Sequence, residues 1–469
     1  MRLLITLMAA CAITTAGSTA QAQDQTNTDK FVSKDDYLKL KEDHAKLKQE
    51  LDALKNQMQE VLKKTAAPES EALKTQLQDL QKKATAQQSE TDQALDDLDK
   101  QVKAAKQMAK DSFPGTTKML LGGYGSATFT STTTGYGPSQ PPAETPAADD
   151  RPGHNFFTAT FNPIFLWKVS DRLLFEGEIE VELGGTEASF ALEMAHLSYI
   201  ANDYLTVSAG KFLNPMDYFV ERQHMAWVNK LPDKPLAVYD GLLPEGLLGI
   251  QARGAVPVGP TKFGYAFYAA NAPSLITSPA DASHPVDVGT LEFDNFDNIG
   301  NHVAVGGRLG FYPIPELEVG YGFQFAGVGP GVDAVFHSAD LTYVRESPRL
   351  MGTINLHAQW VWSDIGRATY DIGNGPFSFN NKRDGGYVQL AYRPTRLEQA
   401  FVKNLEPVFR YDVINQKNTP VGFDEQRWTI GLDYWLTPST VAKIAYEWDR
   451  QDGGGKDGEA LMIQFALGF

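Results

Sequence analysis

The chain has 469 residues, with 58 Asp and Glu against 42 Lys and Arg, and therefore a net charge of −16. This acidic balance argues against nucleic acid as a partner, because contacts to phosphates need basic patches. The single Cys excludes a disulfide scaffold and a zinc ribbon. The chain is rich in Gly and aromatic residues but has no apolar run of twenty residues beyond its N-terminus. The membrane class that stays open is therefore a β-barrel.

Residues 1–22 have the pattern of a secretory signal peptide. Arg2 supplies a positive charge, residues 3–13 form an apolar run, and residues 20–22 (Ala-Gln-Ala) are a small-x-small cleavage site. We therefore expect the protein to be exported. The short stretch that ends at Cys11 loosely resembles a lipoprotein cleavage box, so a lipidated N-terminus stays open as the alternative.

Residues 30–111 predict an α-helical coiled coil. Between Tyr37 and Val61 the seam residues recur at alternating spacings of three and four, and only His44 is polar. Pro68 interrupts the pattern, because the residue before a proline is disfavoured in an α-helix. A narrow apolar stripe does not fold alone, so we expect an oligomer, with a solvated single helix or a linker as the alternative.

From residue 118 onward the apolar residues recur with a period of two, which predicts β-strands. At the end of the chain, for example, Phe465 and Leu467 lie on one face and Gln464 on the other. Most of the predicted strands exceed the ~9–11 residues that a tilted membrane strand needs. We expect sixteen strands, near residues 119–130, 155–168, 172–183, 188–200, 203–212, 247–256, 261–271, 301–312, 316–326, 334–345, 350–362, 385–393, 402–414, 425–436, 440–449 and 459–469.

The connections between these strands alternate in length. Every second connection is a tight turn. The connections between these turns are mostly long, and the long ones lie at residues 131–154, 213–246, 272–300, 363–384 and 450–458. Short turns at one end and long loops at the other are typical of a bacterial outer-membrane barrel. Residues 118–469 are therefore predicted to form an all-β transmembrane barrel of about sixteen antiparallel strands, wide enough for an aqueous channel.

A signal peptide, a coiled coil and a sixteen-stranded barrel that ends in Phe469 together resemble the trimeric outer-membrane porins. In outline the chain is most similar to the phosphate-selective porins O and P and their relatives, which include dicarboxylate porins with an N-terminal coiled coil. The resemblance implies a homotrimer in the outer membrane of a Gram-negative-type bacterium, in contact with lipid and lipopolysaccharide, with the coiled coil in the periplasm. It further implies that the barrel-assembly machinery reads the end at Phe469, and that the loop 213–246 folds inward and narrows the lumen.

Period-two spacing along residues 172–183 places four carboxylates on one face. Because charges facing lipid are costly, we expect this face to line the lumen. The alternative is contact with a neighbouring subunit or pairing with arginines of the wall. The pore-lining candidates are Glu176, Glu178, Glu180, Glu182, Glu193, Arg253, Arg308, Arg410, Arg427 and Lys443. The constriction-loop candidates are Asp217, Glu221, Arg222, His224, Trp227 and Lys230, with the alternative that the aromatic residues merely anchor the loop to the wall.

We therefore expect a porin, a water-filled channel for passive diffusion of small hydrophilic or charged solutes. The barrel is acidic and has no lysine cluster, so phosphate specificity is not carried over from the resemblance. An anion-selective channel for phosphate or dicarboxylate stays open, as does an envelope tether that reaches the cell wall through the coiled coil. The sequence has no G-x-S-x-G, P-loop or H-E-x-x-H motif, so we expect no enzyme, catalytic residue, cofactor or metal site.

Overall fold

The computed structural model describes residue 100 and residues 119–133, 155–184, 187–239, 241–278, 288–293, 302–373, 375–416, 424–452 and 457–469. The predicted signal peptide lies outside these residues, as does the predicted coiled coil except for residue 100. Among the described residues, none of the helices is both long and apolar enough to cross a membrane.

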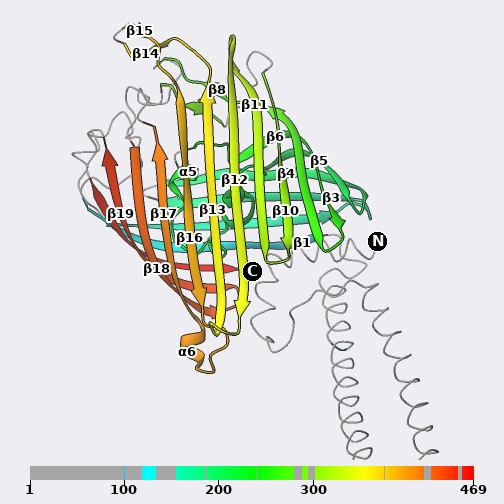
Figure 1. The fold of residues 1–469 in the computed structure, drawn as a ribbon, viewed down its shortest axis with the longest axis vertical. Helices are drawn as coiled ribbons and strands as arrows, with labels where there is room; N and C mark the ends of the chain where they lie inside the picture. The colour runs from blue at the N-terminus through cyan, green and yellow to red at the C-terminus, as the bar shows by residue number, and fades with distance from the viewer. Residues whose placement is uncertain are drawn as a thin grey trace, which may run out of the picture. The chain divides into compact units, whose positions relative to one another are not determined.

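Sixteen strands of the described residues form one closed barrel (Figure 1). Each strand pairs antiparallel with the next, and the first pairs with the last, so the prediction of sixteen antiparallel strands is confirmed. The strands are β1 (Met119–Thr132), β2 (Asn155–Lys168), β3 (Leu173–Gly184), β4 (Glu187–Asn202), β5 (Leu205–Leu213), β6 (Gly246–Val258), β7 (Thr261–Asn271), β10 (Val303–Ile314), β11 (Leu317–Gly329), β12 (Val332–Ser347), β13 (Gly352–Ile365), β16 (Lys382–Arg393), β17 (Leu405–Asn415), β18 (Asp424–Thr437), β19 (Thr440–Asp452) and β20 (Gly458–Gly468).

The other described elements are short and lie in the connections. Two small hairpins, β8 (Ser274–Leu275) with β9 (Leu291–Glu292) and β14 (Tyr370–Asp371) with β15 (Pro376–Phe377), belong to the end with the long loops. The helices are α4 (Tyr218–Gln223) and α5 (Leu236–Tyr239) between β5 and β6, and α6 (Ala400–Lys403) between β16 and β17. Figure 1 shows α6 and the β14–β15 hairpin at opposite ends of the barrel.

The barrel closes between β1 and β20. Gly123 and Phe469 exchange two backbone hydrogen bonds, of 3.1 and 3.0 Å. Gly123 has a φ of +153°, and a Cβ there would lie 2.3 Å from the carbonyl oxygen of Asn162 on the neighbouring strand. A residue without a side chain is therefore required at this point of the seam.

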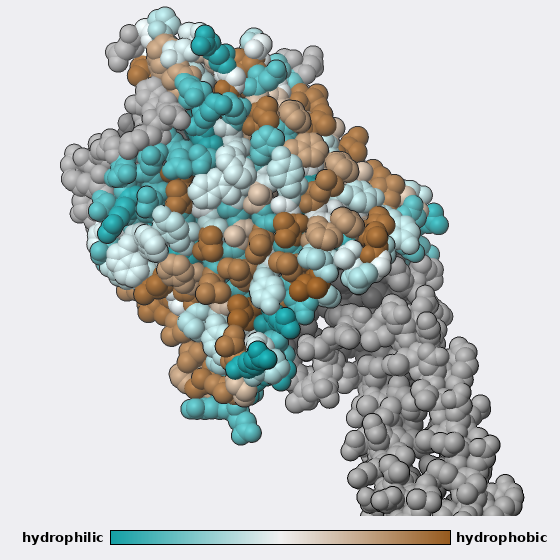
Figure 2. Space-filling view, viewed as in Figure 1, coloured by the Kyte–Doolittle hydropathy of each residue, from teal (hydrophilic) through white to brown (hydrophobic). Residues whose placement is uncertain are grey.

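The two faces of the wall differ in chemistry because side chains alternate along each strand. On β20, Phe465 and Leu467 are exposed on the outside, whereas Gln464 and Ala466 are buried inside the barrel. Figure 2 shows hydrophobic residues gathered over the strands and more hydrophilic residues toward the end that carries the β14–β15 hairpin. An apolar outer face and a polar inner face are the pattern of a transmembrane barrel with a wet interior.

At the long-loop end two connections are short, with only two residues between β3 and β4 and two between β11 and β12. Residues 330 and 331 alone connect β11 to β12, and Gly331 adopts a φ of +71° there. Both strands therefore extend beyond the predicted 316–326 and 334–345, because this tight turn lets their pairing continue to the rim.

Candidate functional site

The predicted loop 213–246, which begins at the last residue of β5 and ends at the first residue of β6, folds back inside the barrel; we call it the inserted segment. The amide of Phe219 donates to Gln359 on β13 at 3.4 Å, and the amide of Leu236 donates to Asp412 on β17 at 3.2 Å. On β19, Lys443 donates to the carbonyl of Asn229 at 2.7 Å. The segment is thus bonded to the inner side of strands far along the chain from its own position.

Local side-chain bonds shape the start of the inserted segment. The buried amide of Asn214 donates to the Pro244 carbonyl at 3.0 Å and accepts from the amide of Met216 at 3.0 Å, so it ties the two ends of the segment together. Asp217 caps α4 by accepting from the amide of Val220 at 3.2 Å. Burial raises the pKa of Asp217 to about 7, although the bond from Val220 acts in the opposite direction.

Three predicted pore-lining cations face inward but are buried beneath the inserted segment. Arg410, fully buried, donates to the carbonyls of Asp233 and Lys234 at 2.9 and 3.0 Å. Arg427 binds the Asp233 carboxylate at 2.7 Å, and Lys443 binds segment carbonyls as described above. These cations fasten the segment to the wall, and in this structure they do not line open water.

Carboxylates of the same wall complete this anchor. Arg410 binds Asp412 at 2.8 Å, and Arg427 binds Asp449 at 2.5 Å. The carboxylate of Glu447 lies 3.6 Å from the guanidinium of Arg427 and 3.8 Å from that of Arg410. Sequence reasoning missed these acids, although period-two spacing from Arg410 places Asp412 on the inner face, and the same spacing from Lys443 places Glu447 and Asp449 there.

A second charged group lies around α4. Arg308, also buried, binds Asp340 at 2.6 Å and Glu318 at 2.8 Å. Arg222 of the inserted segment binds the same Glu318 at 2.6 Å, and one third of the Arg222 side chain is exposed. Its neighbour in the sequence, Glu221, is bound by Arg253 at 2.8 Å, so these arginines are paired with acids.

The remaining loop candidates also hold the inserted segment in place. Trp227 packs in an apolar cluster with Tyr124 and Trp435 and is 4% exposed, so it offers no free face to a solute. Lys230 binds Glu406 at 3.1 Å and lies 5.0 Å from the ring of Trp435. Anchoring, the alternative reading of the loop aromatics, is what the contacts of Trp227 show.

Another part of the wall, on β3 and β4, carries carboxylates that the inserted segment leaves partly open. On β3, Glu176 is one third exposed and lies 3.5 Å from His196, while Glu180 is half-buried. Glu178 between them is completely buried, 3.5 Å from Asn162 and 3.9 Å from His224 of the segment. Glu182 is exposed near the strand end.

A β-bulge adds a further carboxylate to this wall. Glu178 pairs with Met194 and the next residue, Ile179, pairs with Leu192, so Glu193 is the extra residue of β4. The carboxyl group of Glu193 lies against that of Glu180. We call Glu176, Glu178, Glu180 and Glu193 the acid strip.

One lysine of the inserted segment reaches the acid strip. Lys234 binds both carboxylate oxygens of Glu245, at 2.9 and 3.0 Å, and lies in the field of Glu180 and Glu193. Burial alone would lower the pKa of Lys234, but Glu245 and the strip raise it above its usual value. Sequence reasoning did not connect Lys234 or Glu245 to the strip, because only the fold of the segment brings them there.

Within the described ranges, no group of three or more His, Cys, Asp or Glu could hold a metal ion.

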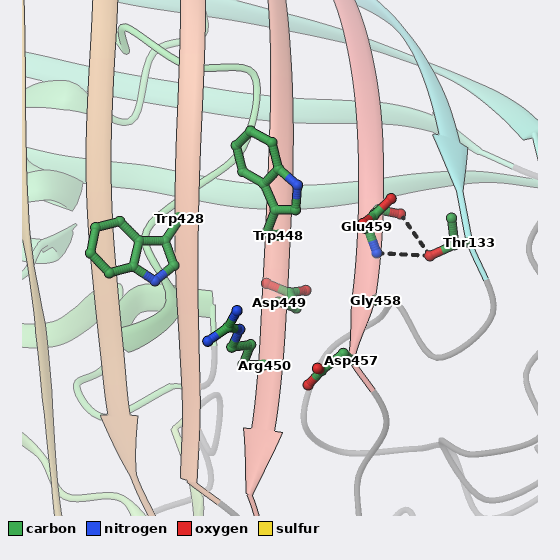
Figure 3. A pocket seen from close by; sticks show the side chains of 8 residues that line it. All are labelled: Thr133, Trp428, Trp448, Asp449, Arg450, Asp457, Gly458 and Glu459. Atoms are coloured by element: carbon green, nitrogen blue, oxygen red, sulfur yellow. Dashed lines mark hydrogen bonds between the residues drawn. The ribbon is translucent and has the colours of Figure 1, made fainter.

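A cavity of about 700 Å³ opens at the rim of the wall, lined by Thr133, Trp428, Trp448, Asp449, Arg450, Asp457, Gly458 and Glu459. Figure 3 shows the two indole rings on neighbouring strands and the hydrogen bond from the Glu459 amide to Thr133, which measures 2.8 Å. Exposed rings at this height are typical of an interface girdle.

The fold and the site thus define a closed sixteen-stranded barrel with an apolar exterior and a segment inside it.

No protein-family model matches the chain, and no curated protein matches it in sequence. Similar solved structures include an anion-selective porin from Comamonas acidovorans, at 13% identity and a TM-score of 0.46, over 75% of this chain and 99% of that one. The outer membrane channel DcaP of Acinetobacter baumannii is similar at 13% identity and a TM-score of 0.46, over 75% and 97% of the two chains. OprB of Pseudomonas putida is similar at 10% identity and a TM-score of 0.47, over 75% and 94%.

Proposed function

We propose that this protein is an outer-membrane porin, a channel for passive diffusion of small hydrophilic or charged solutes. One observation carries the proposal: a closed barrel is apolar on its outside and charged on its inside. A soluble protein would not expose such an apolar exterior, and a barrel with a packed apolar core would not need inward charges. Sixteen strands leave room for water beside an inserted segment.

We propose that the inserted segment narrows this channel against the acid strip. The segment covers the wall of β17–β19, where its anchors are buried, whereas Glu176, Glu180 and Glu193 on β3 and β4 keep contact with water. Solutes would therefore pass along β3 and β4. The charges of a constriction decide which ions pass it.

The balance of exposed charge favours cations. Arg222 and Arg253 are partly exposed, but each is bound to a buried carboxylate. Lys234 binds Glu245 and is attracted by Glu180 and Glu193, while Lys211 acts on Glu193 and Arg253 acts on Glu176. Along this path carboxylates outnumber ammonium groups, so we expect a cation-preferring channel.

A planar bilayer experiment tests this function. The purified protein should produce stepwise open channels, and a salt gradient should give a reversal potential of the sign for cations. The absence of any conductance would refute the porin. A reversal potential of the opposite sign would instead favour the phosphate or dicarboxylate channel, with Arg222 and Arg253 as the residues to mutate first.

We infer the assembly of the protein from its sequence pattern. We infer a homotrimer, a cleaved signal peptide and a periplasmic coiled coil that could reach the cell wall. We also infer recognition of the Phe469 end by the barrel-assembly machinery and contact of the aromatic rim with outer-membrane lipid and lipopolysaccharide. Deleting residues 24–112 tests the coiled coil: a pure porin keeps its conductance, whereas an assembly device loses its trimer.

A further inference from the structure

The cavity at the rim of β18–β20 contains charged groups that an interface girdle does not need. We call this cavity, lined by Thr133, Trp428, Trp448, Asp449, Arg450, Asp457, Gly458 and Glu459, the rim site. Its volume of about 700 Å³ lies within the ~300–1,000 Å³ that small-molecule sites have. A girdle accounts for exposed indole rings, but not for a guanidinium and carboxylates beside them. The rim site is therefore a candidate binding site outside the channel.

The rim site lies at a step in the barrel wall. β19 pairs with β20 only as far as Asp449 opposite Gly458, whereas it pairs with β18 as far as Asp452 opposite Asp424. β19 therefore continues beyond its pairing with β20 by about 10 Å toward the long-loop end. Because Asp449 and Gly458 both line the cavity, the cavity lies where this step begins.

Two indole rings form the apolar side of the rim site (Figure 3). Trp428 and Trp448 pair directly across β18 and β19, and both are exposed on the outer face. Tyr411 packs against Trp428 with ring centroids 4.2 Å apart, and Tyr446 packs against Trp448 at 4.7 Å. Because neighbouring rings hold them, the indoles offer rigid flat surfaces to a ligand at little cost in conformational entropy.

Polar groups of both signs surround the rings. Arg450 follows Trp448 by two residues on the same outer face and is exposed. Among the described residues, no ion pair or hydrogen bond holds its guanidinium. Glu459 lies opposite Trp448 and accepts a hydrogen bond from the hydroxyl of Tyr446 at 2.5 Å, and Asp457 is exposed. The rim site thus combines a donor group, two carboxylate acceptors and an aromatic surface.

This combination matches the chemistry of a neutral saccharide. A sugar ring has a face of C–H groups that packs on an indole, and its hydroxyls donate to carboxylates and accept from a guanidinium. An acyl chain would exclude water from Arg450 and Asp457 without replacing its hydrogen bonds. A phosphate or a carboxylate would be repelled by Glu459 and Asp457, and a free cation by Arg450.

We propose that the rim site binds one ring of a neutral saccharide, stacked on Trp448 and hydrogen-bonded by Arg450 and Glu459. This inference goes beyond the proposed function, because the site lies on the outer wall and its ligand does not pass through the channel. A free oligosaccharide and the sugar of a membrane glycolipid present the same ring, so the experiment has one arm for each source.

The first arm measures retention of the full-length protein on immobilised trisaccharides, in a detergent without a sugar headgroup. We expect trisaccharides of neutral hexoses to retain about fivefold more protein than the matching uronic acids, because the carboxylates of the site repel an acidic ring. The second arm is native mass spectrometry in phosphatidylcholine nanodiscs that contain digalactosyl diacylglycerol. Enrichment of this lipid around the protein, without retention in the first arm, would identify a membrane saccharide. Binding in neither arm, or a preference for uronic acids, would overturn the inference.

Two variants and a matched control sharpen the test. Trp448→Leu keeps an apolar side chain on the outer face but removes the ring, so saccharide binding should weaken about fivefold to tenfold. Arg450→Gln should weaken it about tenfold, because the charged donor is lost. Trp362→Leu is the control, since Trp362 is an exposed outward indole on β13, and binding should stay unchanged. Equal losses in Trp448→Leu and Trp362→Leu would contradict a specific role of the rim site.

Single-channel recording separates this inference from the porin function. Trp448→Leu should conduct like wild type, because the side chain of Trp448 does not face the lumen. A protein that binds saccharide but carries no current would refute the porin and leave the rim site in place. A conducting protein that binds no saccharide in either arm would refute the rim site alone. The comparison of neutral and acidic trisaccharides on the wild-type protein stands even if a variant fails to assemble.

Discussion

The inside of this barrel presents the same residue types in two different roles. On β17–β19, Arg410 and Arg427 are buried with their acids and with Asp233 of the inserted segment. On β3, Glu176 and Glu180 lie partly open to water. A covered ion pair fixes the position of a segment, whereas an open carboxylate acts on what passes. Cover by the segment, and not the residue type, decides which role a charge has.

The largest expected effect comes from breaking the covered side. Arg427→Met leaves Asp233, Asp449 and Glu447 buried without their main counter-charge, which should lower the free energy of unfolding by about 3–5 kcal/mol. The inserted segment should also detach, so single-channel conductance should rise. Thermal unfolding in detergent and bilayer recording measure the two effects.

Arg396→Met is the matched control for this prediction. Arg396 binds Glu346 at 2.8 Å but is 38% exposed, so its loss should cost less than about 1 kcal/mol. Similar destabilisation by both variants would show that the buried anchor has no special role.

The next effect concerns the capping carboxyl of α4. Because burial raises the pKa of Asp217 to about 7, the native state keeps a proton that the unfolded chain loses at lower pH. Stability should therefore fall as the pH rises from about 4 to 7, by up to roughly 4 kcal/mol, and then level off.

Asp217→Asn isolates this contribution, because Asn can also cap a helix but does not ionise. The variant should match wild type near pH 4 and unfold at a higher temperature than wild type at pH 8. Asp171→Asn, in an exposed turn where Asp171 pairs with Lys168 at 2.9 Å, should leave the pH profile between 4 and 7 unchanged. A profile of Asp217→Asn parallel to that of wild type would argue against a protonated Asp217.

The smallest expected effect lies on the open side. Glu176→Gln with Glu180→Gln should reduce the cation-to-anion permeability ratio roughly twofold to fivefold, the equivalent of a partly screened charge interaction of ~0.5–1 kcal/mol. Thermal stability should hardly change, since neither carboxylate anchors the inserted segment. The reversal potential in a salt gradient measures the ratio, and an unchanged ratio would place the selecting charges elsewhere.

The strands could be predicted because a membrane wall imposes a strict alternation that each strand displays locally. All sixteen were found with ends that deviate by at most three residues, and deviations of three occur at one end of β11, β13, β16, β17 and β19. The inward direction of the predicted charges also follows from this alternation. Their exposure does not, because it depends on where residues 213–246 lie.

The bulge at Glu193 shows a second limit of the sequence. Strict period two would put Glu193 and Met194 on opposite faces, yet Glu193 lies against Glu180 while Met194 pairs beside Glu178. A bulge shifts the phase of one strand relative to its neighbour and depends on pairing across strands. The meeting of Lys234 with the acid strip is likewise set by tertiary contacts alone.

The inserted segment also has a consequence for the order in which the protein assembles. Its bonds join Leu236 to Asp412, Asp233 to Arg427 and Asn229 to Lys443, partners that lie 176, 194 and 214 residues apart in the chain. Contacts between such distant partners form late, because the loops that they close are long. A barrel in which β17–β19 have not yet joined lacks the anchors of Asn229, Asp233 and Leu236, so this wall is completed before the passage through the barrel acquires its final width.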